Sequence, residues 1–359
     1  MGHRRVTTVL FGLVAVVLSA GVASAVAVEP APRSAPPRSS ATSAAPPPLS
    51  GSDIAPWAAG GPSSTTTTTT TTTTEAVPSG PDVSAYRGLG AWVDAFDYAP
   101  AYHRPREGPQ LVPHDIDAMA ARGVRTVFLQ AARLDHRSPG GIVDPALTGR
   151  LLKRAHERGM RVVGWYLPKF ADVEADLSNL RLVRDFDVEG HHFDGIAVDI
   201  EYRRDVPDHA ERNRRLIELS RRLRAETGGR ALGAIVYPPV LLDEIRPNFW
   251  PDFPWRELAK SYDVWLPMAY WTEIAAESSY GDGYRYTQAG NRGLIASLGD
   301  PSAVVHSVGG VADTSTVDDF EGFVRAVDET GAAGFSMYDY RTTSPAGWQV
   351  LAPSAPEPA

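Results

Sequence analysis

Short strand-like segments alternate with longer helix-like segments from residue 86 to residue 352, and this alternation constrains the fold more than any other feature of the sequence. The strand-like segments are rich in Val, Ile, Ala and aromatic residues, which is typical of strands buried on both faces. They cover residues 88–96, 125–132, 160–168, 193–202, 231–239, 262–271, 302–310 and 334–340. The main helix-like segments cover residues 114–122, 144–159, 172–185, 208–227, 255–261 and 316–330, with a further one that ends near residue 299.

This pattern predicts an α/β fold, a single closed (β/α)8 TIM barrel over residues 86–352. Eight strands with helices between them fit one barrel of about 270 residues better than two domains. An open doubly wound sheet is the alternative, and it would carry a glycine-rich phosphate-binding turn after its first strand. No such turn follows residues 88–96. Residues 353–359 are expected to be a disordered tail.

The segment before the barrel predicts export. Arg4 and Arg5 precede a long uncharged apolar run, and Ala23-Ser24-Ala25 has the small residues of a cleavage site, so residues 1–25 are a predicted signal peptide. The uncharged run is also long enough to span a bilayer, which leaves a membrane anchor as the alternative. Residues 26–85 are dominated by Ala, Pro, Ser and Thr, which predicts a disordered linker. We expect a secreted or surface-anchored protein.

The charge of the chain excludes some classes of binding partner, and its cysteine content bears on how the barrel is stabilised. The charges in residues 1–85 cancel, so the net charge of −8 belongs to the barrel region. This balance argues against a nucleic-acid partner and against a polyanionic substrate held by charge alone. The chain has no cysteine, so an exported barrel must rely on its hydrophobic core for stability.

The fourth strand-like segment, FDGIAVDIEY at residues 193–202, has two faces of opposite character. Its period of two places Ile196, Val198 and Ile200 on one face and Ala197, Asp199 and Glu201 on the other. Two carboxylates in a buried strand are tolerable at its carboxyl end, where they can meet water or a ligand. Barrel enzymes keep their active sites at that end.

All eight strands of such a barrel open on the same mouth, and their carboxyl ends carry acids, amides and aromatic rings. Aromatic rings stack on sugar rings while carboxylates and amides bond to hydroxyls, so this mouth suits a carbohydrate. The predicted catalytic residues are Glu201 and Asp199. The predicted substrate-binding residues are Asp94, Gln130, Tyr166, Tyr237, Met268, Tyr270, Trp271, Tyr338 and Asp339.

The segment FDGIAVDIEY resembles the fourth-strand signature of the family 18 glycoside hydrolases, the chitinases and their relatives, written D-G-x-D-x-D-x-E. The resemblance makes Asp194 and Gly195 the opening of the signature, and it implies that Glu201 is the proton donor and Asp199 its neighbouring acid. In that family the acetamido group of the substrate attacks the anomeric carbon, and the acid in the place of Asp199 orients it.

Two further segments are similar to motifs of the same family. LPMAYW at residues 266–271 is similar to the sixth-strand M-x-Y motif, which implies that Tyr270 contacts the acetamido group of the substrate. GFSMYDY at residues 334–340 occupies the place of the last strand, where Tyr338 stands in place of the usual Trp. The resemblance covers three short motifs in the expected order.

Two positions depart from the family pattern. Ala197 stands where the family has the middle Asp of its signature, and Trp271 replaces the acidic or amide residue that commonly follows M-x-Y. A two-carboxylate mechanism, with Asp94 or Asp339 as the second carboxylate, is therefore an alternative to substrate assistance.

Structural interpretations of the same residues stay open at this point. Asp199 and Glu201 are alternatively ion-paired with Lys169, Arg203 or Arg204 to close the top of the barrel. The His191-His192 pair is interpreted as a loop feature, and no metal ion or cofactor is expected.

The sequence therefore predicts a hydrolase, a glycosidase that cleaves an extracellular or cell-wall glycan, with N-acetyl sugars as candidate components. The alternatives are a non-catalytic carbohydrate-binding barrel of the cell envelope and a purely structural envelope module.

Overall fold

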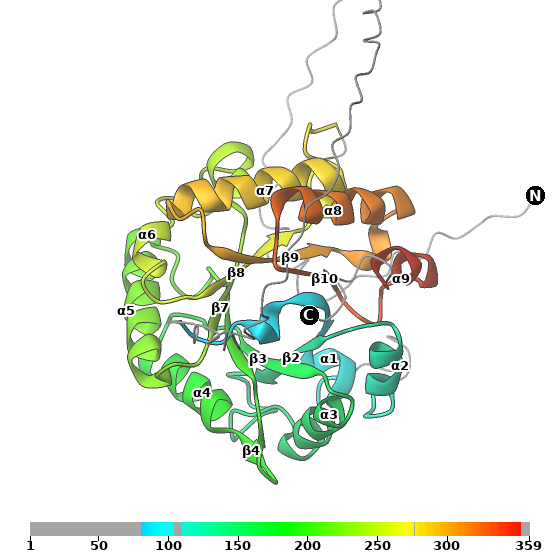
Figure 1. The fold of residues 1–359 in the computed structure, drawn as a ribbon. Helices are drawn as coiled ribbons and strands as arrows, with labels where there is room; N and C mark the ends of the chain where they lie inside the picture. Colours follow the sequence, from blue (N-terminus) through cyan, green and yellow to red (C-terminus); the bar gives the residue numbers. More distant parts are fainter. Residues whose placement is uncertain (1–79, 104–109, 276, 353–359) are drawn as a thin grey trace, which may run out of the picture. The chain divides into compact units, whose positions relative to one another are not determined.

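Residues 80–103, 110–275 and 277–352 are described by a computed structural model, and they form a closed parallel barrel (Figure 1). The order of strands around the barrel is β1-β10-β9-β8-β7-β6-β3-β2. The strands are β1 Gly88–Val93, β2 Thr126–Ala132, β3 Arg161–Tyr166, β6 Gly195–Ile200, β7 Leu232–Val236, β8 Val264–Ala269, β9 Val304–Gly310 and β10 Gly334–Tyr338. The prediction of a (β/α)8 barrel is confirmed. The predicted signal or anchor segment at 1–25, most of the predicted linker at 26–85 and the predicted tail at 353–359 lie outside the described residues.

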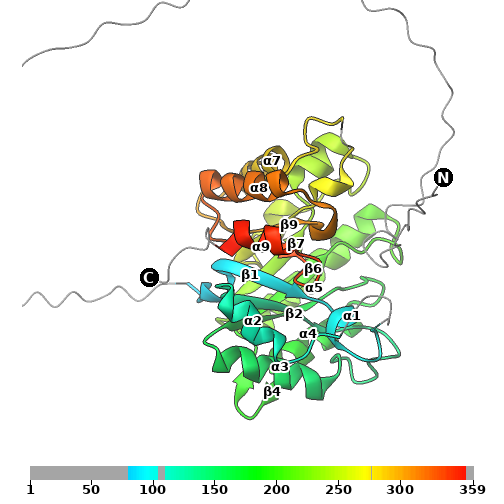
Figure 2. The ribbon, with the colours of Figure 1, turned by 90° about the vertical axis from the view of Figure 1, so that its right-hand side faces the viewer.

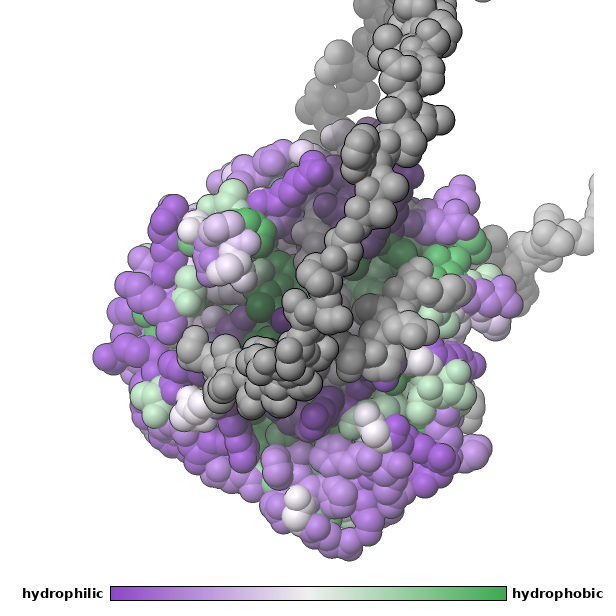
Figure 3. Space-filling model, viewed as in Figure 1, coloured by the Kyte–Doolittle hydropathy of each residue, from purple (hydrophilic) through white to green (hydrophobic). Residues whose placement is uncertain are grey.

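Helices surround the barrel, with α7 and α8 on one side and α2, α3 and α4 on the other (Figure 2). The α-helices are α1 Ala95–Tyr98, α2 Asp115–Ala121, α3 Pro145–Glu157, α4 Val173–Asp185, α5 His209–Thr227, α6 Trp255–Leu258, α7 Gly283–Leu298, α8 Val317–Thr330 and α9 Pro345–Leu351. Shorter elements are η1 Ser84–Tyr86, η3 Val240–Ile245, η4 Trp271–Glu273, η5 Ala312–Thr314 and the hairpin of β4 Asp187–Val188 with β5 His191–His192. No helix in the described part of the chain has the length and apolar character to cross a membrane. Hydrophilic residues cover most of the periphery in Figure 3.

Several helices begin where the sequence supplies a cap. The Asp144 side chain accepts a hydrogen bond from the Leu147 N–H at 3.0 Å, and Pro145 occupies the first turn of α3. The first strand is shorter than the predicted segment 88–96, because Asp94 caps α1 and turns the chain out of the strand. The predicted helix over 255–261 is only the single turn α6.

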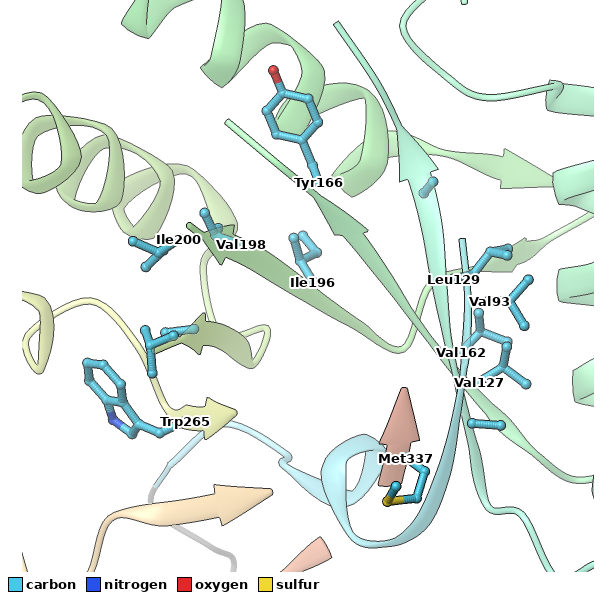
Figure 4. Packing of buried hydrophobic residues seen from close by; sticks show 14 of the residues in the cluster. Val93, Val127, Leu129, Val162, Tyr166, Ile196, Val198, Ile200, Trp265 and Met337 are labelled. Carbon is cyan, nitrogen blue, oxygen red and sulfur yellow. The ribbon is translucent and has the colours of Figure 1, made fainter. Parts of the chain in front are cut away.

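The outward faces of the strands form the main core with the helices. Ile196, Val198 and Ile200 of β6 belong to one buried cluster that includes Leu216 and Leu219 of α5, as predicted from the period of two (Figure 4). The inward face of β6 therefore carries Ala197 and Asp199. This alternation points Asp199 into the barrel.

Aromatic side chains fill the inside of the barrel. The rings of Trp92 and Phe128 stack with centroids 4.7 Å apart, and Trp165 meets Trp92 edge-on at 5.8 Å. His306 is fully buried, and its Nε2 lies 2.8 Å from the Ser336 Oγ. Burial lowers the pKa of His306 to about 4, so this imidazole is neutral at physiological pH. The centre of the barrel is packed, and ligands are restricted to its mouth.

Tyr86 closes the opposite end of the barrel and explains a glycine in the fourth strand. Its hydroxyl donates to the Ile196 carbonyl at 2.8 Å, and its ring lies over Gly195 and Gly233. A Cβ at Gly195 would lie 2.8 Å from the Tyr86 hydroxyl oxygen, which is too close for any side chain. The glycine of the D-G pair is therefore required by packing at the amino end of β6.

Candidate active site at the carboxyl ends of the strands

The acid pair at the end of β6 is the centre of the candidate site. Asp199 is 7% exposed, and its Oδ1 is buried without a hydrogen-bond partner. Burial and then the charge of Glu201 raise the pKa of Asp199 well above its usual range. Glu201 follows the strand and is partly exposed, and burial raises its pKa to about 7. The pair therefore retains protons near neutral pH.

No basic group neutralises this pair among the residues that the structure describes. Neither Asp199 nor Glu201 forms an ion pair with Lys169, Arg203 or Arg204, and no cation contributes to the pKa of either carboxyl group. The alternative in which these acids close the barrel through ion pairs is therefore not observed. A buried acid pair without a cation is costly, which is typical of functional sites.

Two tyrosines extend the site from the acid pair toward β10. Tyr237 follows β7 and Tyr270 follows β8, and both side chains lie on the inward face of the barrel. Burial and the charges of Glu201 and Asp199 raise the pKa of each phenol well above its usual range. The ring of Tyr270 also lies 6.0 Å from the ring of Tyr338. Tyr270 therefore connects the acid pair to the far side of the mouth.

A second acidic group lies on that far side, at the ends of β1 and β10. The carboxylates of Asp94, Asp97 and Asp339 have oxygen atoms within 4.8 Å of one another. The Tyr338 hydroxyl donates to the Asp94 Oδ2 at 2.8 Å, and the Arg341 Nη1 lies 3.3 Å from the Asp97 Oδ1. Strand β10 is four positions from β6 in the closed barrel, so the two acidic groups face each other across the mouth.

The three acids differ from the acid pair in their hydrogen bonds, because most of their oxygens have donors, whereas the Asp199 Oδ1 has none in the described residues. Burial raises the pKa of Asp97 well above its usual range and raises that of Asp339 to about 6. The Asp94 Oδ1 accepts from the Phe96 and Asp97 N–H groups, and the Asp97 Oδ2 accepts from the Asp94 N–H at 2.9 Å. Most of these oxygens are thus already bonded. The three acids are the described residues that are arranged closely enough for a cation, but their geometry is that of a hydrogen-bonded acidic group.

Gln130 supports this acidic group. Its Oε1 accepts from the Ala95 N–H at 3.0 Å and from the Arg133 Nη1 at 3.1 Å. The Gln130 side chain is 2% exposed, and its oxygen holds the first turn of α1 beside Asp94. Gln130 therefore acts on the site through Asp94, whereas we predicted that it contacts the substrate.

The structure corrects the predictions for Tyr166 and Trp271. Tyr166 is fully buried on the outward face of β3, where its hydroxyl donates to the Asp176 Oδ1 of α4 at 2.6 Å (Figure 4). Trp271 is 2% exposed, and its ring lies 5.6 Å from that of Phe323 in α8. Strand ends alternate between the two faces, and each of these residues lies on the face that meets the helices. Both belong to the outer core.

Met268 lies on the inward face two residues before Tyr270 and is 3% exposed. It pairs in register with Val308 of β9 and is part of the barrel filling. Its predicted contact with substrate is therefore replaced by a packing role. Asp94, Asp199, Glu201, Tyr237, Tyr270, Tyr338 and Asp339 are the predicted residues that the structure brings to the mouth.

Arg341, which lies beside the far acidic group, was not predicted, and Asp97 was expected at the mouth but not as a helix cap. Asp97 forms a capping box with Asp94 at the start of α1, and Arg341 follows β10 beside it. The usual sequence signal of a capping box is Ser or Thr followed three residues later by Glu or Gln, and here Asp94 and Asp97 take those two places. The long strand assigned to residues 88–96 concealed that signal.

Replacing Tyr166 by Phe is expected to lower the free energy of unfolding by about 1–2 kcal/mol, because the fully buried Asp176 carboxyl loses a hydrogen bond. Glycan binding should be unchanged, since Tyr166 does not reach the mouth. Denaturant unfolding and glycan binding measured on the same preparation check both points. The matched variant is Tyr237→Phe, which should weaken binding with little loss of stability. Weaker binding by Tyr166→Phe at full stability would contradict this placement.

Comparison with solved structures supports the fold. The C-terminal domain of a putative chitinase from Desulfitobacterium hafniense is 13% identical, with a TM-score of 0.53 over 75% of this chain and 98% of that chain. The spore cortex-lytic enzyme SleL of Bacillus cereus is 10% identical, with a TM-score of 0.51 over 75% and 74% of the two chains. The endo-1,4-β-D-mannanase of Thermotoga petrophila is 10% identical, with a TM-score of 0.50 over 71% and 88%.

No protein-family model matches the sequence, and no curated protein matches it. At these identities the structural likeness shows the fold and leaves the chemistry to the residues of the site. The chain has the closed (β/α)8 fold that is also found in chitinases.

Proposed function

We propose that the protein is a glycosidase in which Glu201 protonates the leaving oxygen of a glycosidic bond. The observation that carries this proposal is the acid pair of Asp199, which is buried, and Glu201, which is partly exposed, with no cation paired to it among the residues that the structure describes. Burial raises the pKa of Glu201 to about 7, so that a large fraction of its carboxyl groups carry a proton at neutral pH. The barrel fold shared with several glycosidases agrees with this role.

The reaction requires a second group, because positive charge develops at the anomeric carbon as the leaving oxygen departs. In a substrate-assisted route, Asp199 and Tyr270 orient an acetamido group of the substrate against that carbon. In a two-carboxylate route, Asp339 or Asp94 serves across the mouth. Burial raises the pKa of Asp339 only to about 6, so it is mostly ionised at pH 7, whereas burial and the charge of Glu201 raise the pKa of Asp199 well above its usual range. The substrate distinguishes the routes, since only the first requires an N-acetyl sugar.

The direct test is the release of reducing ends from a panel of glycans. Chitin oligosaccharides and peptidoglycan fragments provide N-acetyl sugars, and mannan provides a polymer without them. Hydrolysis restricted to N-acetyl substrates supports the substrate-assisted route, and hydrolysis of mannan supports the two-carboxylate route. If none of these glycans is hydrolysed but one is retained, the protein is a binding barrel.

We expect the pH dependence of kcat/KM to reflect the pKa values of Glu201 and, in the two-carboxylate route, of Asp339. Activity should fall about tenfold per pH unit above about 7, because Glu201 loses the proton that it must donate. If Asp339 is the base, activity should also fall below about pH 6, and Asp339→Asn should lose most of the activity at every pH. Initial rates from pH 4 to pH 9 check these limbs. Activity that rises steadily through pH 8 would rule out a protonated Glu201 as the donor.

Ala197 favours a second candidate function, a barrel that binds carbohydrate without cleaving it. The side chain of Ala197 is fully buried and pairs in register with Trp165 and Gly233. The inner side of β6 therefore has no carboxyl group at position 197, two residues before Asp199. Retention of a glycan without release of reducing ends by the wild-type chain would support this function.

The proposal includes export of the barrel to the cell surface or the medium. This part depends on the amino-terminal sequence, in which an apolar run precedes Ala23-Ser24-Ala25. Fractionation of cells that express the full chain, followed by sequencing of the mature amino terminus, tests it.

A further inference from the structure

Three neighbouring strands of the barrel are each followed by a basic residue at the carboxyl end. Arg133 follows β2, Lys169 follows β3 and Arg203 follows β6, and these strands are adjacent in the order β6-β3-β2. We refer to Arg133, Lys169 and Arg203 as the basic rim. The acids Asp94, Asp97 and Asp339 follow β1 and β10. The basic rim therefore lies on the side of the mouth that also carries Asp199 and Glu201.

Arg203 is the best-defined member of the basic rim. Its Nη1 donates to the Phe249 carbonyl at 2.8 Å, and its guanidinium carbon lies 3.6 Å from the centre of the Phe249 ring. Its Nε is buried without a hydrogen-bond partner. Burial lowers the pKa of Arg203, and the charge of no carboxylate opposes this effect. The guanidinium is thus held rigidly in place with its charge uncompensated.

Several arginines elsewhere in the described chain pair with carboxylates. Arg154 contacts Asp117 at 2.8 Å, and Arg181 contacts Glu226 at 2.7 Å. Among the described residues Arg203 has no such pair, which it shares with Arg212 of α5, whose Nη1 donates to the Val206 carbonyl at 2.7 Å. Of these two guanidiniums without an acid, Arg203 is the one that follows a barrel strand. Burial removes water from such a guanidinium, and a bound anion replaces the lost hydrogen bonds. Its planar N–H donors fit a carboxylate.

The position of Arg203 relative to the acid pair defines where that anion would lie. The ring of Tyr237 meets the ring of Phe249 edge-on with centroids 4.9 Å apart, and Arg203 lies against the same Phe249 ring. The phenol of Tyr237 also responds to the charges of Glu201, Asp199 and Arg203. Arg203 follows Glu201 by two residues in the sequence and reaches the site through the Phe249 ring beside Tyr237. An anion bound by Arg203 would therefore lie next to Tyr237, at the side of the acid pair.

We propose that the basic rim at Arg203 is a subsite for a sugar that carries a carboxylate, next to the sugar whose bond is cleaved. This inference rests on the proposed function for the location of the cleaved bond, but the binding subsite can exist without turnover. A hexuronate and a lactyl-substituted amino sugar both present such a carboxylate. The overall charge of −8 means that recognition is local, through placed donors, and does not depend on a general attraction of polyanions.

Binding to the Glu201→Gln chain tests the subsite separately from catalysis. The probes are a hyaluronan tetrasaccharide, which carries hexuronate carboxylates, and a muramic-acid disaccharide, which carries a lactyl carboxylate. Each is compared with its carboxyl-reduced alcohol, and chitotetraose is the neutral reference. Calorimetry should show at least about tenfold tighter binding of a carboxylated probe than of its alcohol, and the preference should shrink in high salt.

In the same background, Arg203→Gln should abolish the preference, whereas Arg203→Lys should retain part of it. Lys169→Gln is the second variant, since the Lys169 ammonium forms no ion pair in the described residues, and it should reduce the preference without affecting folding. The matched control is Arg214→Gln on the outer face of α5, where the side chain is 60% exposed. Equal binding of acid and alcohol, no binding of either carboxylated probe, or a preference unchanged in both Arg203→Gln and Lys169→Gln overturns the subsite. Absence of hydrolysis by the wild-type chain, together with a retained preference for the carboxylated probe, overturns only the proposed function.

Discussion

Glu201→Gln is expected to lower the rate of glycosidic hydrolysis about a thousandfold, because glutamine cannot donate the proton that the leaving oxygen requires. The substitution preserves the size of the side chain, so the mouth should still retain glycan. Tyr237 and Tyr270, which line the site beside the acid pair, are unchanged. Reducing-end release and glycan retention, measured together on the variant, check the two expectations.

The control for this experiment is Glu321→Gln, which removes an acid from the exposed surface of α8 and should leave the rate unchanged. Equal rates for Glu201→Gln and the wild-type chain would exclude Glu201 as the donor. In that event Asp339 would be the next acid to replace, since burial raises its pKa to about 6.

The same substitution is expected to stabilise the protein at alkaline pH. Burial raises the pKa of Glu201 from its ordinary 4.5 to about 7 in the folded state. The folded protein therefore binds more protons than the unfolded chain between these values, and its stability falls as pH rises through that window. The fall amounts to at most about 3 kcal/mol for this carboxyl group, and its partial exposure reduces the value.

Glutamine does not ionise, so Glu201→Gln should be more stable than the wild-type chain at pH 8 by up to about 3 kcal/mol. The two proteins should be closely similar at pH 4.5, where Glu201 is protonated in the folded state. Denaturant unfolding at the two pH values measures the difference. Equal stability of the two proteins at pH 8 would show that Glu201 is well solvated. A stabilised but inactive variant is the combination expected of a catalytic acid held in an unfavourable environment.

The barrel and the acid pair were predictable because they depend on local patterns. Strand-like and helix-like segments alternate along the chain, and the period of two in residues 193–202 separates Ile196 and Ile200 from Asp199. Since parallel strands of a barrel end on one face, the same reasoning brought Tyr270 and Asp339 to the mouth. Those placements follow from the period of two within each strand and from the parallel direction of the strands, and both can be inferred from the sequence.

The errors came from strand ends, where the period depends on where each strand stops. Tyr166 and Trp271 are aromatic residues at strand ends, as Tyr270 is. Each lies one position away from an inward-facing residue, so its side chain faces the helices. Asp94 also ended β1 earlier than the apolar run suggested, because its carboxylate caps α1. A shift of one residue exchanges the two faces of a strand, so composition alone cannot assign a residue to the mouth.

The sequence by itself determined the order of elements, the inward direction of Asp199 and the placement of acids and aromatics at the strand ends. Only the tertiary structure decided which charges neutralise each other. Arg341 lies beside Asp97, while Arg203 lies against Phe249 and, within the described part of the chain, forms no ion pair with Asp199 or Glu201. Burial and distance set the pKa values of Asp199 and Glu201, and both quantities arise only when strands far apart in the chain close into the barrel.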